Sequence, residues 1–229
     1  MLYLESAMVT HATQDYLKVI FKLSRDRKAV STNAIADKMD VSQASVTAML
    51  KKLSELKLIT YTPYYGVNLT HPGRKIALEI IRHHRLLELY LFEALGYSWD
   101  RVHEEAEKLE RVISEEFEEK IVHFLDNPTI DPHGAPIPGK DGKIQEHVLV
   151  PLTDAEVGQK VRVERVSDSD SGMLRYMEKI GILPEVEMEV LEKAPFRGPL
   201  RIQIGEKQIH MGESLSNQIL ISEIVCDQS

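Results

Sequence analysis

The sequence has 229 residues, 43% of them hydrophobic and 28% charged, and a formal net charge of −8. This composition is typical of a globular protein with material for two or three small cores, and no apolar run approaches the ~20 residues that a membrane span needs. A single cysteine, Cys226, excludes an intramolecular disulfide and a thiolate-rich zinc site. Because the amino terminus also lacks the segments of a secretory signal, we expect a cytoplasmic protein.

Three helices and a hairpin are predicted in the amino-terminal third. A helix over 10–23 and a polar connection at 25–28 precede a short helix over 33–39, capped by Ser31 or Thr32. After a turn at Asp40 and Val41, a longer helix capped by Ser42 covers 43–56. β-like runs at 59–62 and 67–70 flank a turn at 63–66. The pattern predicts a helix-turn-helix completed by a wing.

The outward face of the 43–56 helix is small and polar at its start and basic further on. Such a face lets a recognition helix approach the major groove, where Gln43 can pair with adenine and Lys51 and Lys52 can meet phosphates. The predicted DNA-binding residues are Ser42, Gln43, Ala44, Ser45, Thr47, Ala48, Lys51 and Lys52. A winged helix used for protein contacts is the alternative.

The charge distribution favours DNA. Residues 1–75 contain eleven Lys and Arg against six Asp and Glu, about +5, so the remainder carries about −13. A basic head attracts the phosphate backbone, whereas an acidic body is repelled by it and attracts cations. An acidic surface that only keeps the protein soluble is the alternative for the second part.

The central part is predicted to be helical and the carboxyl-terminal part to be β-structure. Amphipathic helices cover 74–95 and 102–125, and the apolar stripe of the second is long enough to form a dimer interface. Prolines and glycines at 126–143 indicate a structured loop and a linker. Period-two runs at 159–166, 185–191, 200–204 and 207–211, with a short helix near 173–180, predict a small β-barrel.

Five residues of the central helices have metal-ligand spacing. His84 and Glu88 are four apart, and His103, Glu107 and Glu110 are four and three apart, so each set shares one helix face. Imidazole and carboxylate donors without thiolate suit Mn(II) or Fe(II), and the excess of oxygen favours manganese. A solvated acidic helix with incidental histidines is the alternative, since nine acidic residues lie between 100 and 120.

These features together resemble the iron- and manganese-dependent repressors typified by the diphtheria toxin repressor (DtxR) and the manganese transport repressor (MntR). The markers are DYLKVIFKL from Asp15, VSQASVTAMLKKLSELKLI at 41–59, LTHPGR at 69–74, HHRLLELYL at 83–91 and VHEEAEKLE at 102–110. The resemblance implies an α+β fold. Its domains would be a winged helix-turn-helix at 1–73, an all-α dimerisation domain at 74–143 and an SH3-like (FeoA-like) barrel at 151–229.

The resemblance also implies two metal sites. The primary-site positions are matched by Asp15, Glu107 and Glu110. The ancillary-site positions are matched by His84, Glu88 and His103, with an oxygen added by Asp168 or Asp170 of the SH3-like domain.

One departure from the family pattern concerns the primary site. Arg111 stands where a histidine is often found, and it cannot ligate because it stays protonated. A branch of manganese sensors has a Cys-Pro-His-Gly loop where this chain has Asp131-Pro-His-Gly134. His133, with Asp131 as companion, is therefore predicted to complete the primary site. A rigid turn with an exposed histidine is the alternative.

The implied function is a homodimeric repressor of metal-uptake genes that binds palindromic operator DNA when loaded with Mn(II). Fe(II) is the second candidate activator, and Zn(II) or Cd(II) would substitute in vitro. A metal joining Asp15 to the central helices would fix two recognition helices about one DNA turn (~34 Å) apart by a population shift. A winged-helix sensor of an organic ligand, which would ignore EDTA, is one alternative. A metalloenzyme is another, disfavoured because the HExxH, Ser/His/Asp and phosphate-loop patterns are absent.

Overall fold

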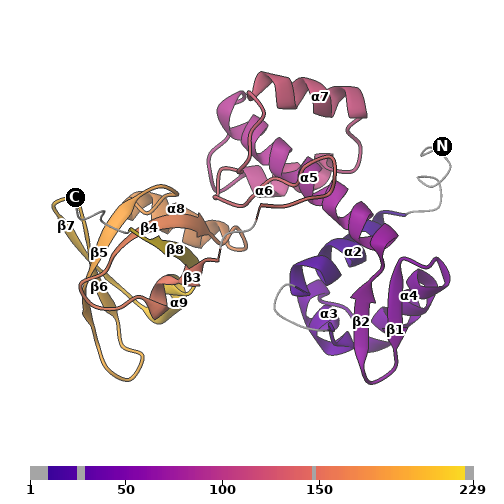
Figure 1. The fold of residues 1–229 in the computed structure, drawn as a ribbon, viewed down its shortest axis with the longest axis horizontal. Coiled ribbons are helices and arrows are strands. Elements are labelled where there is room, and N and C mark those ends of the chain that lie inside the picture. The colour runs from indigo at the N-terminus through magenta and orange to yellow at the C-terminus, as the bar shows by residue number, and fades with distance from the viewer. Residues whose placement is uncertain (1–9, 25–28, 146–147, 225–229) are drawn as a thin grey trace. The chain divides into compact units, whose positions relative to one another are not determined.

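The computed structural model describes residues 10–24, 29–145 and 148–224 (Figure 1). The amino terminus, the connection predicted at 25–28 and Cys226 lie outside these residues. The chain divides into two compact units. The first unit is Met1–His83 with Glu110–Val112 and Pro138–Lys143, and the second unit is His84–Leu109, Ile113–Ile137 and Ile144–Ser229.

The first unit contains the predicted helix-turn-helix. Its helices are α2 (His11–Leu23), α3 (Thr32–Met39) and α4 (Gln43–Glu55). The hydroxyls of Ser31 and Ser42 accept hydrogen bonds from Ala34 N and Ser45 N, both at 3.2 Å, and so cap α3 and α4 as predicted. Asp40 ends α3 in the left-handed region (φ 53°), which reverses the chain tightly before α4.

A wing and the start of a long helix complete this unit. Strands β1 (Ile59–Thr62) and β2 (Gly66–Leu69) pair antiparallel, with Ile59 opposite Leu69. Helix α5 (His71–Glu93) begins three residues before the predicted start. Pro72 lies in the first turn of this helix, where a proline is tolerated because its missing N–H has no partner to lose.

The second unit corrects one predicted helix. The single helix expected over 102–125 is two helices, α6 (Val102–Leu109) and α7 (Glu115–Phe124). Ser114 caps α7 by accepting a hydrogen bond from Phe117 N at 3.2 Å, and three glutamates follow in its first turn. The apolar spacing runs through the break, so periodicity alone could not detect it.

The carboxyl-terminal part is an antiparallel sheet in the order β3-β8-β4-β5-β6-β7. Its strands are β3 (Val150–Pro151), β4 (Lys160–Val166), β5 (Glu187–Lys193), β6 (Leu200–Ile204), β7 (Lys207–Met211) and β8 (Ile219–Glu223). The four predicted strands and the helix α8 (Ser171–Ile180) are present. Two strands, β3 and β8, were not predicted. The pairings among the described residues do not join β3 to β7, so the predicted barrel is an open sheet.

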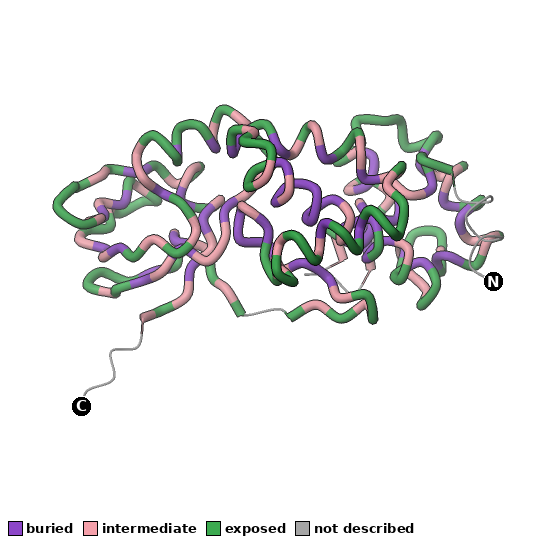
Figure 2. The backbone as a smooth tube through the Cα atoms, turned by 90° about the horizontal axis from the view of Figure 1, so that it is seen from above, coloured by how far each residue is buried: buried purple, intermediate pink, exposed green. Residues whose placement is uncertain are grey.

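Buried residues run along helices and strands of both units (Figure 2). One apolar cluster of the second unit forms between α5, α6 and α7, with Leu87, Val102 and Ile121 among its members. A second cluster fills the inner face of the sheet, and it includes Trp99 from the connection between α5 and α6. Trp99 therefore anchors the sheet to the helical part of the same unit. No described helix is long and apolar enough to cross a membrane.

Candidate metal centre

Three predicted ligands of the central helices meet in the second unit. His84 and Glu88 lie one turn apart on α5, and His103 lies in the first turn of α6. Glu88 Oε1 is 3.0 Å from His84 Nε2 and 2.9 Å from His103 Nδ1, and the two imidazole nitrogens are 3.0 Å apart. Glu88 is fully buried and His84 nearly so. Two imidazoles and a carboxylate this close together inside a protein are unusual unless they share a proton or a cation.

The sheet adds a carboxylate to this group. Asp168, between β4 and α8, has its Oδ2 3.5 Å from His103 Nδ1. The ligand atoms of His84, Glu88, His103 and Asp168 all lie within 4.8 Å of one another, which is a spacing that one ion can bridge. The other candidate, Asp170, is the N-cap of α8 and accepts a hydrogen bond from Met173 N at 2.9 Å. The arrangement therefore favours Asp168.

A second group shares Glu88. The ligand atoms of Glu88, Asp131 and His133 also lie within 4.8 Å of one another, and all three residues are buried. Asp131 Oδ1 accepts hydrogen bonds from the backbone N–H groups of His133 and Ala135, both at 2.9 Å, which orients its carboxylate. His133 is 1% exposed, so the alternative of an exposed histidine on a turn is wrong.

The side chain of His133 is held in one tautomer. Its Nε2 lies 3.0 Å from the carbonyl oxygen of Trp99, and a carbonyl only accepts, so Nε2 carries the proton. In the neutral form of the imidazole, Nδ1 then has a free lone pair. It is buried and has no hydrogen-bond partner among the described residues, and the same is true of Glu88 Oε2. Two buried lone-pair atoms without partners in one cluster fit a bound cation, which both could ligate.

The electrostatics of this cluster also fit a cation. Burial and the neighbouring charge of Glu88 raise the pKa of Asp131 to about 6, although Arg85 and His133 lower it. Burial alone would raise the pKa of Glu88 as well, but the charge of His84 and hydrogen bonds from His103 and His84 hold that pKa well below its usual range. Two carboxylates in repulsion inside the protein are stabilised by a positive ion.

Backbone contacts explain why the loop with His133 lies here. Val166 N at the end of β4 donates to the carbonyl oxygen of His133 at 2.9 Å, and the indole of Trp99 donates to that of Pro132 at 2.9 Å. Gly134 has φ +85°, and a Cβ there would lie 2.0 Å from the carbonyl oxygen of Glu164. Sequence reasoning did not identify Trp99, although a single tryptophan in a Gly-Tyr-Ser-Trp-Asp turn was a signal.

The predicted primary-site residues have other neighbours within each unit. In the first unit, Lys18 Nζ lies 2.7 Å from Glu110 Oε2 and 3.1 Å from Oε1, and Arg111 pairs with Asp15. In the second unit, Glu107 Oε1 lies 3.8 Å from His103 Nε2. Asp131 and His133, predicted as companions of Asp15, Glu107 and Glu110, are grouped with Glu88. Helix spacing could not reveal this grouping, because a loop and a strand bring those residues together.

The predicted DNA-binding residues form the start and outer face of α4. Ser42, Gln43, Ala44, Ser45, Ala48, Lys51 and Lys52 are exposed and Thr47 is half-buried. Val46, Leu50 and Leu53 on the opposite face are fully buried. Ser42 also caps the helix, and Thr47 donates its hydroxyl to the carbonyl oxygen of Gln43 at 2.8 Å. The hydroxyls of Ser42 and Ser45 also lie 2.9 Å apart, while Gln43, Lys51 and Lys52 extend from the exposed face of the helix, where a recognition helix contacts DNA.

Three family domains match the chain in order. Residues 8–67 match the N-terminal DNA-binding domain of iron-dependent repressors, and residues 70–139 match their metal-binding and dimerisation domain. Residues 150–223 match the FeoA domain.

Whole proteins of known function are also similar. A solved manganese-dependent transcriptional repressor in complex with manganese is 37% identical, with a TM-score of 0.85, covering 92% of this chain and 99% of that chain. The repressor ScaR with bound Zn²⁺ is 31% identical, with a TM-score of 0.78, covering 92% and 99%. The iron-dependent repressor IdeR of Mycobacterium leprae is 27% identical over 225 residues, which are 93% of this chain and 97% of that protein.

These matches confirm the predicted fold class and the prediction of a repressor rather than a metalloenzyme. DNA binding through the amino-terminal domain and dimerisation through the central domain are the roles that the matched domains carry. The chain belongs to the DtxR/MntR family of metal-dependent transcriptional repressors.

Proposed function

We propose that this repressor is activated by Mn(II) bound in the second unit. The observation that carries the proposal is two clusters of potential ligands joined by the buried Glu88, one fully and one partly buried. Glu88 Oε2 and His133 Nδ1 have no hydrogen-bond partner among the described residues. His84, His103 and Asp168 complete the first cluster, and Asp131 and His133 complete the second. The assignment of Asp15, Glu107 and Glu110 to a metal stays a prediction from the resemblance.

The donor types favour manganese. Both clusters offer imidazole nitrogen and carboxylate oxygen and no sulfur. Hard oxygen donors suit Mn(II), whereas soft thiolates favour later metals. Fe(II) is the second candidate, and the relatives include an iron-dependent repressor. Zn(II) and Cd(II), which are named with ScaR, are expected to enter the same clusters in vitro.

The ligands could control the conformation because they come from separate segments. Residues of α5, α6, the 131–134 loop and the β4–α8 connection supply the donors. Without an ion, the carboxylates of Glu88, Asp131 and Asp168 repel one another. An ion bound by all of them favours the arrangement in which these segments meet, which is a population shift toward the DNA-competent dimer.

The DNA partner would be a palindromic operator upstream of metal-uptake genes. In a two-fold symmetric dimer, two copies of α4 reach successive major grooves when they are about one DNA turn (~34 Å) apart. The exposed Gln43 and the small residues around it would read bases, and Lys51 and Lys52 would bind phosphates.

The test is DNA binding with and without metal. Duplexes selected from a random-sequence pool by the Mn(II)-loaded protein supply the probe, and fluorescence anisotropy gives its affinity. Chelation with EDTA should weaken binding by roughly 5- to 150-fold, the usual size of such coupling. Glu88→Gln should remain weak at the Mn(II) level that saturates the wild type, because it removes the shared ligand.

The matched control is Glu105→Gln, which removes a glutamate charge on α6 from an exposed ion pair with Lys108. This variant should keep the metal response. Equal affinity of the stripped and loaded wild-type protein for the selected duplex would contradict the proposal.

A further inference from the structure

Four charged residues of the first unit form a compact cluster, which we call the ionic clasp: Asp15, Lys18, Glu110 and Arg111. Asp15 and Lys18 lie three residues apart on α2, and Glu110 and Arg111 directly follow α6 in sequence. Lys18 Nζ contacts both oxygens of the Glu110 carboxylate, at 2.7 and 3.1 Å. Arg111 pairs with Asp15 and also approaches Glu110 Oε1 at 3.6 Å. Each acid in the clasp therefore faces a cation.

The clasp is electrically balanced and partly closed to solvent. Lys18 is 6% exposed and Glu110 is 1% exposed, so this pair is screened little by salt. Two carboxylates balance one ammonium and one guanidinium. A divalent ion in the same place would add two positive charges to a neutral group and would have to displace Lys18 from both Glu110 oxygens. The donor atoms are present, but the electrostatics do not fit a metal.

The contrast with the second unit is direct. There, Glu88 Oε2 and His133 Nδ1 are buried without hydrogen-bond partners among the described residues, and the carboxylates of Glu88 and Asp131 repel each other. In the clasp, the corresponding acids have cationic partners. A bound cation would therefore stabilise the Glu88 cluster, whereas in the ionic clasp Lys18 and Arg111 already neutralise the two carboxylates.

We propose that the ionic clasp takes the place of the metal at Asp15 and Glu110, the positions where the resemblance puts the primary site. Lys18 and Arg111 do what an ion would do: they offset the two carboxylates and hold α2 against Glu110–Val112 whether or not metal is present. Resting on the proposed function, this assigns the metal response to the donor clusters of the second unit. Chelation then leaves the clasp intact.

The number of bound Mn(II) ions tests whether Asp15 and Glu110 are metal ligands. Calorimetric titration of the stripped full-length protein with Mn(II) should give the same number of ions and the same affinities for Asp15→Asn and Glu110→Gln as for the wild type. Glu88→Gln should lower the number bound. Loss of one equivalent of Mn(II) in Asp15→Asn or Glu110→Gln would overturn the clasp and restore the metal assignment.

A double-mutant cycle in EDTA tests whether the Lys18–Glu110 pair stabilises the fold without metal. Lys18→Met and Glu110→Leu each remove one member of the Lys18–Glu110 pair and leave the other buried charge without this partner, so each should raise the unfolding constant on the order of 100-fold or more. The double variant removes both charges of this pair and should recover most of that loss. If the losses of unfolding free energy in the two single variants simply add up in the double variant, the two residues are not coupled, and the clasp is contradicted.

The matched control is the exposed pair of Lys108 and Glu105 on α6, at 2.9 Å, where the same cycle should show almost no coupling. The two proposals fail separately. If the wild type takes up no Mn(II), the proposed function fails, while the cycle in EDTA still decides whether the clasp exists.

Discussion

At the scale of single residues, Trp99 and His133 join the metal cluster to the sheet. The backbone carbonyl of Trp99 fixes the proton on His133 Nε2, and the indole of Trp99 lies in the apolar core of the sheet. The two rings are 5.3 Å apart. A group that accepts a hydrogen bond from the other ring nitrogen of a metal-binding histidine usually fixes the ring orientation and raises the basicity of the ligand nitrogen. Trp99 is therefore a positioning residue for His133.

The fluorescence of Trp99 should report the occupancy of this cluster. It is the only tryptophan of the chain and is 2% exposed. Mn(II) is paramagnetic and quenches an excited indole at short range, so titration of the stripped protein should quench the emission until the His133 cluster is full. His133→Ala should weaken the quenching, because only the cluster of His84, Glu88, His103 and Asp168 then remains, whereas His123→Ala, which changes an exposed histidine on α7, should retain it in full. Undiminished quenching in His133→Ala would place the ion elsewhere.

At the scale of elements, local sequence signals predicted where helices lie but not which helices contact one another. The caps Ser31 and Ser42 and the apolar stripes located α3, α4 and α5 within a few residues, because capping and amphipathicity are local properties. The break between α6 and α7 was missed, since the apolar spacing continues across it. The side chains of Glu110 and Arg111 at that break contact α2, and only the fold decides this.

The loop at 131–134 depends on a glycine for its approach to the sheet. Gly134→Ala should destabilise the second unit and weaken Mn(II) binding at His133, because a Cβ would lie 2.0 Å from the carbonyl oxygen of Glu164 and the φ of +85° disfavours a side chain. We expect a loss of about 2 kcal/mol or more in the free energy of unfolding. Denaturant unfolding and Mn(II) titration measure the two effects.

Gly205→Ala is the control for this prediction. Gly205 also has a positive φ, +55°, but a Cβ there meets nothing within 4 Å. This variant should lose only the ~1 kcal/mol of the unfavourable backbone conformation and keep its Mn(II) affinity. Equal losses in the two variants would show that the contact with Glu164 is unimportant.

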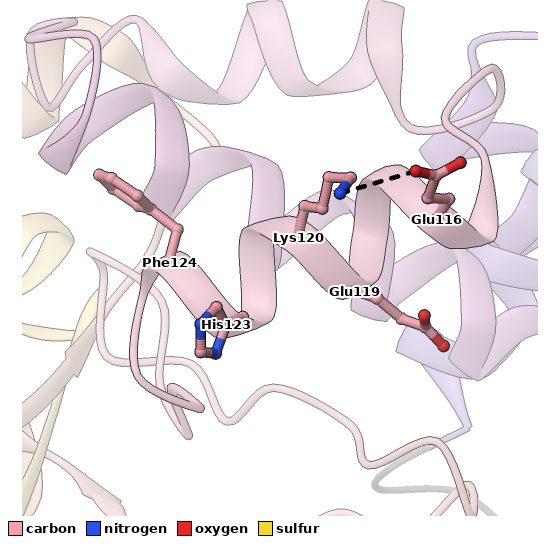
Figure 3. A pocket seen from close by; sticks show the side chains of 5 residues that line it. All are labelled: Glu116, Glu119, Lys120, His123 and Phe124. Carbon is pink, nitrogen blue, oxygen red and sulfur yellow. Dashed lines mark ion pairs between the residues drawn. The ribbon is translucent and has the colours of Figure 1, made fainter.

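At the scale of the whole molecule, one face of α7 is left uncovered by the other described residues. Figure 3 shows Glu116, Glu119, Lys120, His123 and Phe124 around a pocket, and all of them come from this one helix. Phe124 is 64% exposed and Phe117, on the same helix, is 39% exposed. Both rings stack edge-on against Tyr90 of α5, which fixes their positions. Exposed aromatic residues in a dimerisation domain are suited to an interface between two copies of the chain.

Charging this face should separate the dimer. Phe124→Asp places a carboxylate where a second copy is expected to pack, so sedimentation should show a shift from dimer to monomer at micromolar concentration, with the circular dichroism unchanged. Phe196→Asp is the control, since Phe196 is fully exposed at the β5–β6 turn, outside the residues matched to the dimerisation domain. A dimer that persists in Phe124→Asp would exclude this face from the interface.

The sequence by itself determined the helix-turn-helix with its caps, the strand pattern of four of the six carboxyl-terminal strands and the chemical type of the ligands. These depend on spacing, propensity and side-chain chemistry, which are local. The tertiary structure decided which residues meet: Glu88 with both His103 and His133, Asp168 rather than Asp170 beside His103, and Lys18 with Glu110. Such meetings join segments far apart along the chain, and their physical cause is the packing of helices, loop and sheet, which no short-range pattern records.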